Sequence, residues 1–94
     1  MKFSKNLIIS KLLGIIQAIE KMSPKERQEI PTPEFIRNYN TIRKIALGMF
    51  PNLEKIFPPE LEIFKDEIDI EFVRTKYVEV LSYCLEIKEL LQSS

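Results

Sequence analysis

The chain has 94 residues, of which 45% are hydrophobic, and it carries 14 basic and 14 acidic side chains. This length and apolar content predict one small folded domain over residues 1–94 and exclude an intrinsically disordered chain. The sequence has no histidine, which removes the commonest general base and metal ligand, and its single cysteine excludes an intrachain disulfide. We therefore expect no catalytic residues, no metal site and no cofactor, and the lone cysteine fits a reducing, cytoplasmic location.

The first predicted helix covers Ser4–Met22 and carries an apolar stripe along one side. Lys11 interrupts the apolar run, and the segment is too short and too polar to cross a bilayer. We therefore expect a structural helix rather than a signal peptide or a membrane anchor. The stripe residues are separated alternately by four and three positions, which places them on one helix face: Ile8, Leu12, Ile15, Ile19 and Met22.

Three small residues, Ser10, Gly14 and Ala18, lie four positions apart on the same helix. Small side chains allow another backbone to approach closely, whereas a helical glycine costs about 1 kcal/mol relative to alanine. The line is therefore a candidate self-association surface or close helix crossing. The simpler interpretation is that Gly14 is an exposed glycine without a role.

The second predicted helix, Pro33–Met49, follows strong start signals. Ser23 and Glu26 have the spacing of a capping box, which predicts a short helical turn over residues 24–29. Thr32 is the expected N-cap of the second helix, because a proline follows it at the first helical position. The apolar stripe of this helix consists of Phe35, Tyr39, Ile42, Ala46 and Met49.

The opposite side of the second helix is polar and is the best candidate for a partner-binding surface. Arginine and asparagine side chains bind phosphates, carboxylates and base edges. Two interpretations compete with binding: a solvated face on which Arg37 lies near Glu34, and asparagines that hydrogen-bond a neighbouring loop. The candidate binding residues are Arg37, Asn38, Asn40, Arg43 and Lys44.

The proline-rich middle, residues 52–68, has no clear helical repeat. Asn52 suits the start of a short turn that ends at Phe57, and Pro59 suits the start of another short helix. Isoleucines alternate with acidic residues in EIDIEF, which is a strand pattern. A single strand would lack a pairing partner, so we expect helix or extended loop there. The acidic residues match no EF-hand loop and are expected to form a solvated edge.

The third predicted helix runs from Asp69 to Leu91 and has a seam of three heptads. Cys84 lies on the seam and is expected to be buried and unreactive. A strip nearly opposite is a second candidate for self-association, or for packing under the proline-rich middle: Phe72, Tyr83 and Leu90. The seam itself consists of Ile70, Val73, Tyr77, Val80, Cys84, Ile87 and Leu91.

The net charge of zero hides an uneven distribution. Residues 1–50 carry nine basic and four acidic side chains, a net charge of +5, and residues 51–94 carry five and ten, a net charge of −5. We expect the two halves to face each other so that their charges partly cancel. The alternatives are a basic surface for an acidic partner or nucleic acid, and a head-to-tail oligomer.

These patterns predict an all-α fold, a small antiparallel three-helix bundle with one or two short helical turns in the proline-rich middle. The leading functional hypothesis is a non-enzymatic module for protein–protein interaction or for self-association as a homodimer, because the apolar helix surface exceeds what one small bundle buries. The alternative is a nucleic-acid-associated regulatory protein that uses the basic face of residues 37–44. A carboxylate–metal enzyme acting on nucleotides would need paired E-x-x-E elements on facing helices, and the spacings at Glu26/Glu29 and Glu86/Glu89 are common by chance.

Overall fold

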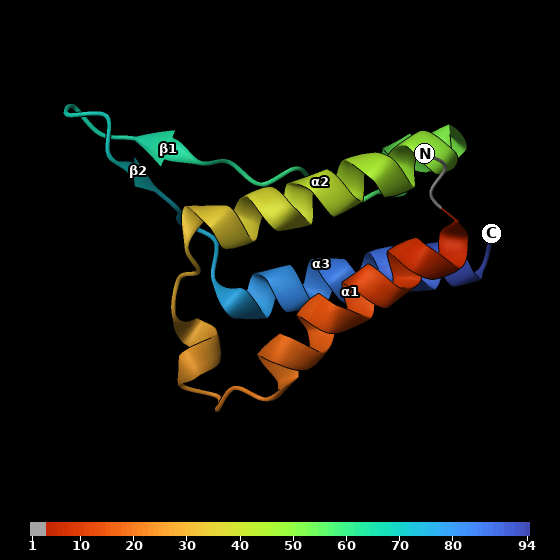
Figure 1. Cartoon of the computed structure of the whole chain (residues 1–94), viewed down its shortest axis with the longest axis horizontal. Coiled ribbons are helices and arrows are strands. Elements are labelled where there is room, and N and C mark those ends of the chain that lie inside the picture. Colours follow the sequence, from red (N-terminus) through yellow and green to blue (C-terminus); the bar gives the residue numbers. More distant parts are fainter. Residues whose placement is uncertain (1–3) are drawn as a thin grey trace.

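The computed structural model describes residues 4–94 and shows three α-helices packed side by side, with a small hairpin that projects from one end (Figure 1). The predicted helical bundle is confirmed, and α2 keeps its predicted bounds. The elements are α1 (Lys5–Glu20), η1 (Glu26–Gln28), α2 (Pro33–Met49), η2 (Pro51–Ile56), β1 (Phe64–Lys65), β2 (Glu71–Phe72) and α3 (Tyr77–Gln92).

Side-chain caps fix where the first elements begin. The Ser4 hydroxyl accepts a hydrogen bond from the Leu7 amide at 3.1 Å, and the Thr32 hydroxyl accepts one from the Phe35 amide at 3.2 Å. Between them, the Ser23 amide donates to the Glu26 carboxylate at 2.9 Å and the Glu26 amide donates to the Ser23 hydroxyl at 3.2 Å. The predicted capping box is therefore confirmed, and it opens the short 3₁₀ turn η1.

The core lies where the apolar faces of the three helices meet, and α1 packs more extensively against α3 than against α2. No charged side chain among residues 4–94 is buried. Burial of each large apolar side chain contributes about 1.5–3 kcal/mol, so this interior supplies most of the stability. The largest fully buried side chains are Tyr39, Ile8, Leu12, Ile19, Ile36, Ile87, Leu91, Val80 and Cys84.

Residues 57–63, here called the return segment, run back along α2 toward its first turn. Its first contact is with Arg43, and later residues of the segment contact Tyr39 and Asn40, which lie nearer the start of α2. As a result α3 runs in the same direction as α2, whereas α1 runs opposite to both (Figure 1). The turn η2 matches the predicted short turn, but no helix starts at Pro59.

The structure corrects two predictions in the region that follows. The third helix begins at Tyr77 rather than Asp69. Residues 71–72 form a strand, because residues 64–65 supply the pairing partner that the sequence analysis did not find. The pairing is antiparallel, with Phe64 opposite Phe72. The α3 start is fixed instead by the Glu79 carboxylate, which accepts from the Lys76 amide at 3.1 Å.

Among the described residues, no helix combines the length and the apolar character that crossing a membrane requires.

Candidate functional site

The polar face of α2 contacts other segments of the same chain through Arg37, Asn40 and Arg43. The Asn40 amide group donates to the Leu61 carbonyl at 2.8 Å and accepts from the Leu61 amide at 2.9 Å. Arg43 Nε donates to the Pro58 carbonyl at 2.7 Å, and its guanidinium lies 5.8 Å from the centre of the Phe57 ring. These contacts satisfy backbone groups of a segment that has no secondary structure of its own.

Tyr39 completes this attachment from the core side of α2. Its hydroxyl donates to the Pro59 carbonyl at 3.0 Å, while its ring lies fully buried beside Tyr83. Burial raises the pKa of the Tyr39 phenol above its ordinary value, so the hydroxyl stays a hydrogen-bond donor at all physiological pH values. The return segment is therefore held by three neighbouring α2 side chains.

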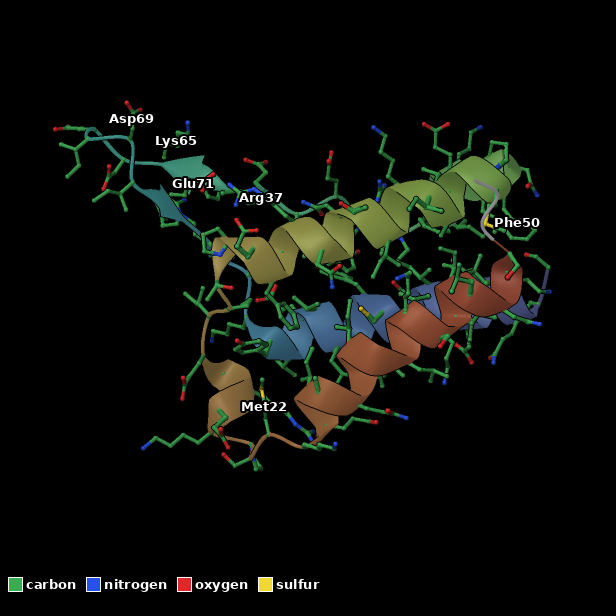
Figure 2. The ribbon with its side chains drawn as sticks, in the orientation of Figure 1. Met22, Arg37, Phe50, Lys65, Asp69 and Glu71 are labelled. Carbon is green, nitrogen blue, oxygen red and sulfur yellow. The ribbon has the colours of Figure 1, made fainter. Side chains whose placement is uncertain are left out.

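Arg37 connects α2 to the hairpin. Its guanidinium forms ion pairs with Glu34 on the same helix, as expected, and with Glu71 on β2 (Figure 2). The hydrogen bond to Glu71 raises the pKa of Arg37 above its ordinary value. Of the five candidate binding residues, three thus have partners within the chain, whereas Asn38 and Lys44 are exposed.

The hairpin, residues 64–72, is here called the hairpin arm, and it stands away from the bundle (Figures 1 and 2). Its base is ordered by dedicated contacts: the Phe64 and Phe72 rings stack with centroids 5.4 Å apart. The Arg74 guanidinium lies 4.6 Å from the Phe64 ring centre and 5.6 Å from that of Phe72. The arm is therefore a defined structure, although it lies outside the core.

The tip of the arm, residues 66–70, is a tight turn. One Asp66 carboxylate oxygen accepts from the Ile68 and Ile70 amides, both at 2.9 Å. Asp69 has φ of 62°, the left-handed conformation that completes a three-residue hairpin loop and that glycine usually supplies. This turn leaves Ile68 74% exposed and Ile70 57% exposed.

A groove runs between α1 and α2 on the surface of the bundle, with a volume of about 290 Å³. Gly14 and Ala18 form part of its wall, and a Cβ atom added at Gly14 would meet nothing within 4 Å. Two of the small residues therefore open a space between helices that larger side chains would fill, whereas Ser10 is exposed outside it. The remaining lining residues are Lys11, Ile15, Phe35, Asn38 and Ile42.

The predicted strip of Phe72, Tyr83 and Leu90 does not exist as one surface. Phe72 belongs to β2 rather than to α3, so it does not share a helix face with the other two. Tyr83 and Leu90 are half-buried and pack against the core. This correction follows directly from the later start of α3.

Cys84 is fully buried, as expected, and burial raises the pKa of its thiol to about 12. Over residues 4–94, no three histidine, cysteine or acidic side chains are grouped so that they could hold a metal ion. Among residues 4–94, one ion pair, Arg37–Glu71, joins the two oppositely charged halves of the chain.

Sequence reasoning missed the exposed tip. The only signal in the sequence was the strand pattern of EIDIEF, of which residues 71–72 form a strand and the preceding residues form the turn at the tip. Comparisons with protein-family models, with curated proteins and with solved structures give no match to this chain.

Proposed function

We propose that this protein is a non-enzymatic protein–protein interaction module and that the hairpin arm is its contact element. The observation that carries the proposal is the exposure of Ile68 and Ile70 at the tip of an ordered arm. Of the large hydrophobic residues in the described part of the chain, Ile68 is the most exposed. Burying such a side chain in a partner contributes about 1.5–3 kcal/mol, which the free protein forgoes.

The arm is built in a way that favours binding. The stacked rings of Phe64 and Phe72, the Arg37–Glu71 pair and the Asp66 hydrogen bonds order it before any partner arrives. An ordered element loses less conformational entropy on association than a flexible loop does. The same contacts add little to the core, so their role is to present the tip.

The residues of the tip indicate what kind of partner surface would be complementary to it. Asp66, Glu67 and Asp69 surround the two exposed isoleucines, and none of the three forms an ion pair with residues 4–94. A complementary surface has an apolar hollow with basic side chains at its edge. The nucleic-acid alternative has less support, because Arg37 and Arg43 already bind groups of their own chain.

The test is site-specific photo-crosslinking. A photoreactive amino acid replaces Ile68 in one variant and Ile56, which is 61% exposed on η2, in the control. Both variants are irradiated in an extract of cells that express the protein. We expect a discrete covalent adduct from position 68 that exceeds any adduct from position 56. Equal, diffuse labelling from the two positions would refute the proposal.

A further inference from the structure

The hairpin arm and the α1–α2 groove have complementary chemistry within one chain. The hairpin arm, residues 64–72, carries four acidic side chains and one lysine, a net charge of −3. Helices α1 and α2 together carry five basic and two acidic side chains, a net charge of +3. Because a single ion pair joins these two regions in the folded chain, both charges remain largely available to a partner.

We propose that the hairpin arm docks in the α1–α2 groove of a second copy of this chain, and that two copies exchange arms in a closed dimer. This inference rests on the proposed function, because it names the partner of the same arm. Ile68 and Ile70 of one copy occupy the groove of the other, and the acidic groups of the tip lie beside Lys11.

The groove has the shape and surface that this occupant needs. Ile15, Phe35 and Ile42 give it apolar walls, and Gly14 and Ala18 keep it open between the helices. Lys11 lines the groove and has no ion-pair partner among residues 4–94. The acidic tip therefore supplies the charge that the groove lacks, and its isoleucines supply the apolar side chains.

The arm of a chain cannot fill the groove of the same chain in this fold. The Arg37–Glu71 pair fixes the base of the arm to the first turns of α2, and Figures 1 and 2 show the tip directed away from the helices. A second molecule is thus required. One tip in a groove of about 290 Å³ is a small contact, whereas a two-fold dimer makes the contact twice.

The first experiment measures dimerisation by sedimentation equilibrium of the full chain. Gly14→Leu fills the groove at a position where an added side chain meets open space, and leucine is a better helix former than glycine. Gly48→Leu makes the same change on an exposed turn of α2 outside the groove. We expect wild type and Gly48→Leu to dimerise equally, and Gly14→Leu to raise the dissociation constant at least about tenfold.

The second experiment reverses charge without changing the core. Lys11→Glu is expected to weaken the dimer several-fold, and Glu67→Lys is expected to weaken it similarly. The double variant Lys11→Glu/Glu67→Lys restores the pair across the interface and is expected to recover most of the lost affinity. Circular dichroism of every variant checks that it is folded. Additive weakening in the double variant would overturn the proposed contact.

The outcome for wild type separates this inference from the proposed function. A strict monomer at the highest soluble concentration overturns the exchange of arms. The proposed function then survives if the crosslinker at position 68 still captures a different protein. If position 68 gives an adduct of twice the chain mass, mapping of the crosslinked peptide to α1 or α2 supports the inference, and mapping elsewhere contradicts it.

Discussion

The two sides of α2 stabilise the protein through different interactions: apolar packing on one side, and hydrogen bonds with an ion pair on the other. Its apolar side packs into an interior of large side chains in which no charged group of residues 4–94 is buried. Its polar side holds the return segment and the hairpin arm through hydrogen bonds and one ion pair to another element. Apolar burial contributes much stability, but a core position accepts another apolar side chain of similar volume. Paired hydrogen bonds, in contrast, fix a chain segment in one register. The comparison separates the part of the protein that makes it stable from the part that positions its arm.

The largest expected effect is on the apolar side. Leu12 is fully buried, so Leu12→Ala is expected to lower the free energy of unfolding by about 3 kcal/mol through lost burial and the resulting cavity. Urea denaturation followed by circular dichroism measures the change. Leu85→Ala on α3 is the control, because Leu85 is 36% exposed and should lose less than about 1 kcal/mol. Equal losses at the two positions would contradict the described core.

The next effect tests the polar side. Asn40→Ala leaves the Leu61 amide and carbonyl without their partners and is expected to lower the free energy of unfolding by about 2 kcal/mol. Asn38→Ala changes the same residue type on the same helix at an exposed position, and should stay within about 0.5 kcal/mol. Hydrogen exchange should show that the Asn40 variant exposes the Leu61 amide while α1 and α3 remain protected. Two indistinguishable variants would mean that Asn40 does not hold the return segment.

The pH dependence of the free energy of unfolding tests the apolar side of the comparison through the buried thiol of Cys84. Burial raises the pKa of Cys84 to about 12, so the folded state keeps its proton at a pH where the unfolded state loses it. The contribution of the Cys84 thiol to the free energy of unfolding is fully present below the ordinary thiol pKa, and it is lost as the pH rises toward 12. We expect the free energy of unfolding to fall by about 1 kcal/mol more between pH 8.5 and 10 in wild type than in Cys84→Ala. Parallel pH profiles for the two proteins would count against a buried thiol.

The smallest expected effect concerns the tip of the arm. Asp69 adopts a left-handed conformation that glycine adopts without strain, so Asp69→Gly is expected to raise stability by about 0.5 kcal/mol. Asp66→Ala has the opposite sign, because it removes the acceptor of two amide hydrogen bonds. Hydrogen exchange at the Ile70 amide measures both changes locally. A loss of protection in Asp69→Gly would show that the Asp69 side chain stabilises the turn.

Much of the bundle could be predicted because its signals are local. Thr32 and the proline after it fix the start of α2, and Ser23 with Glu26 fixes the turn before it. The seam of α3 from Tyr77 onward follows the helical repeat, and Cys84 on that seam is buried as predicted. In each case residues within one or two turns of the chain determine the conformation.

The hairpin arm could not be predicted in the same way, since its strands are two residues long and pair with each other across the tip. Asp69 replaces the glycine that normally reveals such a loop, and the spacing of Ile70, Val73 and Tyr77 imitates a helical repeat. The interpretation that the asparagines hydrogen-bond a neighbouring loop is confirmed for Asn40. The sequence could not identify the segments that Asn40 and Arg43 bind, because these lie 21 and 15 positions away along the chain.

The extensive packing of α1 against α3 has a consequence for how the chain is made. These helices are the first and the last of the described elements to leave the ribosome. The part of the α1 apolar face that packs against α3 therefore stays uncovered until residues 77–92 emerge. Such distant contacts slow folding and leave hydrophobic surface exposed to aggregation or chaperone binding in the meantime. A nascent chain arrested after the hairpin arm is therefore expected to be retained by chaperones, whereas one that includes α3 is released as a folded protein.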